Sequence, residues 1–163
     1  MEESIADALE ILKQAMQIEQ DGHEFYLKTA QSTQDEGGKN TFRTLANDEK
    51  NHLSLAARQY NSLKEDQLWI ELPKAKTESI DADEPLFPRD RAAIPVISNA
   101  ADALLFGLDI ETKSYELYSK AASKTSNPQG KAMYEFLAME EIRHFDLLMM
   151  RYDQLSGAPG WQS

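Results

Sequence analysis

The side chains best suited to chemistry in this sequence are glutamates and histidines that recur at fixed spacings. Two Glu-x-x-His motifs occur, and a further glutamate lies 30 residues before the glutamate of each motif. These residues are Glu19, Glu49, His52, Glu111, Glu141 and His144. Carboxylate and imidazole groups bind iron, zinc and manganese. The spacing therefore predicts a metal site, provided that the fold brings the two copies together.

The elements that must position these residues read as four long helices. Apolar residues at alternating three- and four-residue spacings predict helices over 4–34 and 38–65, a third from Ser98 or Asn99, and a fourth from Pro128. Four prolines between 73 and 95 exclude a continuous helix there. We therefore expect a single domain over residues 1–163, with a helix pair at 4–65, a crossover at 66–98 and a helix pair at 99–157.

The two predicted helix pairs repeat each other at a constant offset of 92 residues. Over 18–63 against 110–155, 16 of 46 positions are identical without a gap. A shared amphipathic pattern accounts for matched leucines, but it does not account for matched Glu, His and Tyr residues within the apolar stripes. The repeat therefore indicates two equivalent halves that build one site.

All six candidate ligands fall on the apolar stripes, which are expected to face the interior of the bundle. Burying four unpaired carboxylates is costly, and no Lys or Arg shares the stripes at mid-bundle. Shared protons or bound cations must therefore balance the charge, and the two histidines favour cations. Distances along the helices from each turn agree, so the six side chains can meet in one layer.

One glutamate from each of two helices, with Glu-x-x-His from each of the other two, is the pattern of ferritin-like di-iron and di-manganese bundles. The segments IEQDGHEFYLKTA with LANDEKNH, and IETKSYELYSKAA with LAMEEIRH, resemble the rubrerythrin and ferritin-like family. This resemblance implies an all-α, ferritin-like four-helix bundle that holds two iron ions, with manganese or zinc as other possible metals. It also implies that Glu49 and Glu141 bridge the metals, that Glu19 and Glu111 are terminal ligands, and that each iron has one histidine.

The function expected from this resemblance is redox chemistry at a non-haem di-iron site. The protein would reduce hydrogen peroxide or dioxygen, or oxidise ferrous iron, with an external electron donor such as a rubredoxin-like protein. Homo-oligomerisation, with a dimer favoured, follows from the resemblance alone. The alternatives are iron storage without turnover, a di-manganese catalase-like enzyme, and a metal-free interaction module.

The sequence departs from the rubrerythrin pattern at two points. It has no cysteine, so it lacks the cysteine-ligated rubredoxin iron of full-length rubrerythrins. In addition, Ser114 stands where rubrerythrins carry an extra glutamate. A redox-driven shift of iron towards that glutamate is therefore not expected here.

Three further side chains near the predicted site each have two possible roles. Tyr26 and Tyr118 are either core aromatics or groups that hydrogen-bond ligand carboxylates or donate electrons. His23 lies one helical turn beyond Glu19 and is either a seventh ligand or a neighbour of the site.

The composition excludes several classes of partner. The net charge is −11, so no basic patch is available for nucleic acid or an anionic membrane. No apolar run has the length of a membrane span, and the N-terminus lacks the pattern of a signal peptide. A cytoplasmic location is the expectation.

Overall fold

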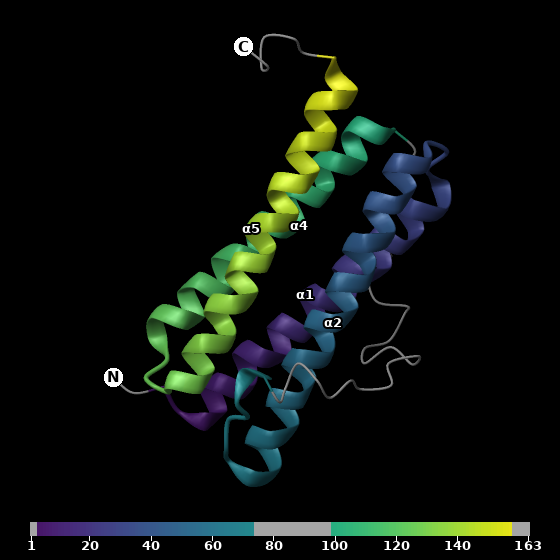
Figure 1. Cartoon of the computed structure of the whole chain (residues 1–163). Helices are drawn as coiled ribbons and strands as arrows, with labels where there is room; N and C mark the ends of the chain where they lie inside the picture. The colour runs from purple at the N-terminus through teal and green to yellow at the C-terminus, as the bar shows by residue number, and fades with distance from the viewer. Residues whose placement is uncertain (1–2, 74–98, 158–163) are drawn as a thin grey trace.

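The computed structural model describes residues 3–73 and 99–157, and within them it contains four long helices and no strand. They are α1 (Ile5–Ser32), α2 (Glu36–Asp66), α4 (Ala100–Lys124) and α5 (Pro128–Ser156). Helix α1 packs against α2, and α4 packs against α5, while the two pairs meet mainly through α1 and α4 (Figure 1). The predicted all-α four-helix bundle is confirmed.

Each helix starts where a side chain can satisfy the free N–H groups of its first turn. Ser4 and Asp7 form a capping box at the start of α1. The side chains of Asp35 and Asn99 accept from backbone N–H groups at the starts of α2 and α4. Asn127 caps α5 just before Pro128. Because Asp35 is a cap, α2 begins at residue 36, two residues before the predicted start.

The interior consists of two apolar halves separated by a polar layer. One half lies at the end that holds the α4–α5 turn and includes Leu12, Leu63 and Leu137. The other half lies at the α1–α2 turn and includes Phe25, Leu45 and Leu148. The middle turns of all four helices, between these halves, carry the six candidate ligands.

A short segment after α2 is fixed to the bundle by a buried amide. The side chain of Gln59 donates to the carbonyl of Ile70 at 2.8 Å and accepts from its N–H at 2.9 Å. Both sides of an otherwise costly buried amide are thereby satisfied. This pair holds Trp69 against the apolar half that contains Tyr134.

The sequence also predicted a crossover between the helix pairs and no membrane-spanning segment. Most of the predicted crossover, from residue 74 to residue 98, lies outside the described residues, as does Trp161. None of the described helices combines the length and the apolar character that crossing a membrane requires.

Candidate metal centre

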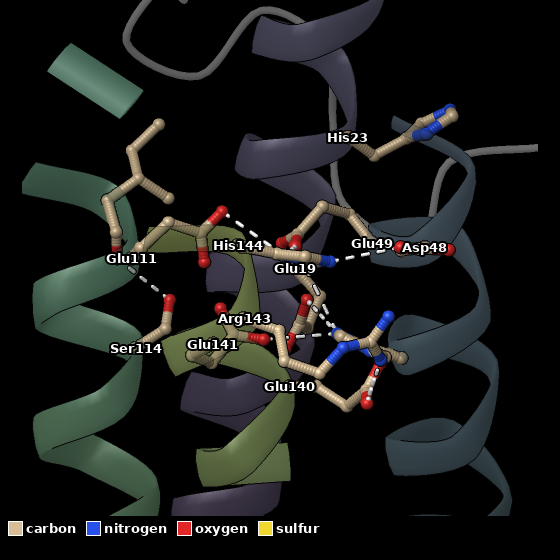
Figure 2. Close-up of polar contacts among 12 residues, drawn as sticks. Glu19, His23, Asp48, Glu49, Glu111, Ser114, Glu140, Glu141, Arg143 and His144 are labelled. Carbon is tan, nitrogen blue, oxygen red and sulfur yellow. Dashed lines mark hydrogen bonds and ion pairs between the residues drawn. The ribbon is translucent and has the colours of Figure 1, made fainter. Parts of the chain in front are cut away.

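The polar layer at mid-bundle contains all six residues that the sequence singled out, and every one of them is buried. The four glutamates are 0% exposed, and the two histidines are 4% and 3% exposed. They arrive from four helices, since the two motif pairs lie on α2 and α5 and the single glutamates on α1 and α4 (Figure 2). The structure therefore brings the two halves of the repeat together face to face.

The six side chains form two overlapping groups whose oxygen and nitrogen atoms lie within 4.8 Å of one another. Two residues, Glu49 and Glu141, belong to both groups. The first group is completed by Glu19 and His52, and the second by Glu111 and His144. The layer thus offers two adjacent sets of candidate metal ligands that share two carboxylates.

The inward-facing atoms of the layer lack hydrogen-bond partners in the described structure. They include both carboxylate oxygens of Glu49 and of Glu141, and the Nδ1 atoms of His52 and His144. His144 Nδ1 lies 2.9 Å from Glu49 Oε1, and His52 Nδ1 lies 3.1 Å from Glu141 Oε1, without hydrogen-bond geometry. Buried polar atoms are rarely left unpaired. Converging oxygen and nitrogen donors of this kind fit divalent transition metals.

The pKa values of the layer are shifted because four carboxylates are buried close together. Burial raises the pKa of Glu49 and of Glu141 well above the usual range, and neighbouring carboxylates raise it further. Burial raises the pKa of Glu19 too, but the adjacent His52 outweighs this and lowers it. For His144 burial lowers the pKa, yet its contacts with carboxylates prevail and raise it to about 12. The carboxylates thus compete for positive charge, which protons or metal ions can supply.

Two acidic residues that the sequence analysis did not single out hold the outer edges of the histidine rings. Asp48 Oδ2 lies 3.1 Å from His144 Nε2 (Figure 2). Glu140 Oε2 lies 3.7 Å from His52 Nε2. Each acidic residue contacts the histidine of the other motif. A carboxylate on the outer nitrogen fixes the ring and leaves the inner nitrogen free for a metal. The signal in the sequence is an acidic residue directly before the glutamate in both motifs.

Two buried tyrosines on α1 and α4 each donate a hydrogen bond to the ligand glutamate of the other helix. Tyr26 on α1 donates to Glu111 Oε1 on α4 at 2.6 Å, and Tyr118 on α4 donates to Glu19 Oε1 on α1 at 2.5 Å. Burial raises the pKa of both phenols well above the usual value, and the neighbouring carboxylates add to the effect. Both tyrosines therefore act as hydrogen-bond donors that orient carboxylates, while a role in electron donation stays a prediction.

His23 and Ser114 do not enter the layer as ligands. His23 Nδ1 lies 2.7 Å from the carbonyl oxygen of Ala46, and the ring lies apart from both groups (Figure 2). Ser114 is buried and donates to the carbonyl of Ile110 at 2.9 Å. The repeat partner of Ser114 is Gly22, where an added Cβ would lie 2.7 Å from Glu49 Oε2. Because Gly22 has no side chain, the Glu49 carboxylate fits beside it, a role that the sequence analysis missed.

The fold and this layer define a ferritin-like helical bundle with a core of carboxylates and histidines. The chain belongs to the rubrerythrin family, whose model matches residues 10–152. A search of curated proteins finds no match to this sequence.

Two solved structures share the fold at low sequence identity. One is described as a dodecameric thioferritin, the bacterioferritin-related protein from Bacteroides fragilis. It has a TM-score of 0.71 and 15% identity, and the match covers 96% of this chain and 90% of that chain. The other is a two-domain protein from Anabaena variabilis with DJ-1/ThiJ/PfpI-like and ferritin-like domains. It has a TM-score of 0.68 and 12% identity, and the match covers 94% of this chain and 41% of that chain.

Proposed function

We propose that this chain is a non-haem di-iron redox protein that reduces hydrogen peroxide or dioxygen with electrons from an external donor. The observation that carries the proposal is the pair of overlapping ligand groups that share Glu49 and Glu141. Family membership supports it, because the same residues match the motifs through which the sequence resembles rubrerythrins.

In this proposal two metal ions would be held by the two ligand groups, with Glu49 and Glu141 serving both groups and the remaining four ligands divided equally between them. Two divalent ions balance four carboxylates, which removes the electrostatic cost of the buried layer. Bound iron would supply redox chemistry and an electrophilic centre for the oxidant. The protein contributes fixed geometry: Tyr26 and Tyr118 orient the terminal carboxylates, and Asp48 and Glu140 orient the histidines.

Metal analysis of protein purified without chelator, combined with optical spectra before and after peroxide, tests this function. We expect two iron ions per chain, a near-ultraviolet oxo-diferric band on oxidation, and peroxide consumption faster than by free ferrous iron. Manganese with oxygen evolution would instead indicate catalase-like chemistry. Failure to take up any divalent metal would contradict the proposal.

A second candidate is iron storage, which the likeness to a protein described as a dodecameric thioferritin favours. Storage requires a closed assembly with an interior large enough for iron far in excess of two ions per chain. Sedimentation and iron-loading titration separate the two functions. A dimer that saturates at two iron ions supports redox turnover, whereas a large shell that continues to load iron supports storage.

We regard residues 1–163 as one ferritin-like domain that forms a homo-oligomer. A rubredoxin-like protein is the donor class that suits a chain without cysteine.

A further inference from the structure

Three aromatic rings in contact connect the polar layer to a partly exposed tryptophan. Tyr118 donates to Glu19 in the layer, and its ring centroid lies 6.5 Å from that of Tyr134. Tyr134 in turn lies 5.7 Å from Trp69, edge to face. Both tyrosines are 0% exposed, whereas Trp69 is only partly buried. The contacts thus run from the candidate metal centre to the outer part of the bundle at the α4–α5 turn.

Over residues 3–73 and 99–157, the other half of the repeat does not have this series. Tyr26 is the repeat partner of Tyr118 and makes the equivalent hydrogen bond, to Glu111. The rings beside Tyr26 are those of Phe25 and Phe42. Phe42 is the repeat partner of Tyr134. A benzene ring is far harder to oxidise than a phenol or an indole, so among the described residues only the Tyr118 side joins oxidisable rings to a partly exposed tryptophan.

Trp69 is held in this position by specific contacts. The backbone of the next residue, Ile70, is fixed by two hydrogen bonds to buried Gln59. The indole also lies over Gly130, where an added Cβ would be 2.9 Å from the ring. Glycine at this position therefore allows the indole to lie close to α5 and against Tyr134.

We propose that Trp69, Tyr134 and Tyr118 form a path that carries single electrons from the protein surface to the buried layer. A path is needed because the four glutamates are fully buried and the chain has no cysteine to hold a redox cofactor of its own. The path rests on the proposed function for its oxidant, which is hydrogen peroxide reacting at the metal-loaded layer. The partner that it implies is a one-electron reductant that acts at Trp69.

In each pass one electron moves inward along the path, and each proton that is released is later recovered. When Tyr118 loses one electron towards the layer, its phenolic proton passes to Glu19 along their hydrogen bond. Trp69 then gives one electron to Tyr118, which recovers the proton from Glu19, and the indole N–H proton leaves Trp69 for solvent. The external reductant restores Trp69 as the indole takes a proton back. Two passes supply the two electrons that, with two protons, reduce one hydrogen peroxide to water.

Tyr134 has a different role from the other two rings. Its hydroxyl has no hydrogen-bond partner in the described structure, so no hydrogen bond leads its proton to an acceptor. A phenol that cannot release its proton is hard to oxidise. Tyr134 therefore serves as the aromatic contact across which the electron passes, and its hydroxyl is not required.

Pulse radiolysis of the metal-free, full-length chain tests the path without relying on metal chemistry. In a Trp161→Phe background Trp69 is the single tryptophan, and azidyl radicals oxidise it in preference to tyrosine. We expect the tryptophanyl absorption to decay into tyrosyl absorption at a rate that is independent of protein concentration, because an electron passes from Tyr118 to oxidised Trp69 across the same contacts in the reverse direction. Tyr118→Phe should slow this transfer about tenfold or more. The matched variant Tyr26→Phe, which loses the equivalent hydrogen bond, should leave the rate unchanged.

The outcomes of this experiment separate the path from the proposed function. Equal rates in Tyr118→Phe and in its parent would overturn the path, and so would loss of transfer in Tyr134→Phe, since that variant keeps the ring. Peroxide consumption by the iron-loaded protein is measured independently. Turnover without tryptophan-to-tyrosine transfer would leave the proposed function standing and refute the path. Tryptophan-to-tyrosine transfer without peroxide turnover would leave the path standing and refute the proposed function.

Discussion

At the scale of single residues, the four glutamates of the layer differ in how many candidate ligand groups they belong to. Glu49 and Glu141 belong to both ligand groups, whereas Glu19 and Glu111 belong to one each. We predict that Glu49→Gln loses both metal ions and that Glu19→Gln retains one. Metal analysis after gel filtration measures this directly. Equal losses in the two variants would show that the glutamates are equivalent and would refute the bridging role.

Gly22 is a residue whose importance lies in the side chain that it lacks. Alanine at this position gains up to about 1 kcal/mol of helix propensity. Its Cβ would lie 2.7 Å from Glu49 Oε2, so the carboxylate must move. We predict that Gly22→Ala leaves the metal-free protein as stable as the parent but weakens zinc binding about tenfold or more. Ser114→Ala, at the repeat-equivalent position, is the control and should bind zinc normally in calorimetric titrations.

Asp48 acts on the layer through a histidine. Its contact with His144 Nε2 fixes the ring that presents Nδ1 to the second ligand group. We predict that Asp48→Asn weakens metal binding at that group about 10- to 100-fold. Glu140→Gln should have a smaller effect, because Glu140 lies farther from its histidine and also pairs with Arg143. Competition with a coloured chelator measures both, and the reverse order would contradict this account.

At the scale of the helix, the caps decide where each element begins, and Asn127 offers a clean test. Its side-chain oxygen accepts from the N–H groups of Gln129 and Gly130 at 2.9 and 3.1 Å. We predict that Asn127→Ala lowers the stability of the metal-free protein by about 1 kcal/mol. For a chain of this size the melting temperature should fall by about 2–4 °C.

The control for this cap is Asn127→Ser, which keeps a side-chain acceptor at the start of α5. Its melting temperature should stay close to that of the parent. If serine and alanine destabilise α5 equally, the loss arises from something other than the cap.

At the scale of the whole molecule, the buried layer sets how stability responds to pH. His52 and His144 have folded-state pKa values above their ordinary 6.5, so the stability that they contribute is present below pH 6.5 and declines as pH rises. The raised pKa values of Glu49 and Glu141 act in the same direction from pH 4.5 upward. Glu19 acts oppositely, but its lowered pKa matters only below pH 4.5.

We therefore predict that the metal-free protein melts at progressively lower temperature as pH rises above 6.5. Metal binding requires deprotonated ligands, so the stabilisation by zinc should grow over the same range. Differential scanning calorimetry with and without zinc measures both trends. Glu141→Gln should flatten the trend of the metal-free protein. A melting temperature that rises with pH in the absence of metal would contradict this picture.

The sequence alone determined the four helices and the identity of the buried layer, whereas the Asp35 cap that sets the start of α2 was missed. Helical periodicity is a local property, and Ser4, Asn99 and Asn127 satisfy N–H groups only two or three residues away. The layer was predictable because the repeat places Glu and His residues in apolar stripes twice over. Two equivalent halves that bury such stripes have to face each other, so the position of the candidate ligands followed without the tertiary fold.

Only the tertiary structure decided which side chain meets which across the halves. The hydrogen bond from Tyr118 to Glu19 spans 99 positions, and the contact of His144 with Asp48 spans 96. Such pairings depend on the relative height and rotation of packed helices, which helical periodicity does not specify. The contact of Trp69 with Tyr134 depends on how a non-helical segment folds back on the bundle. These contacts across the fold decide how the candidate ligands are oriented and where we expect electrons to enter.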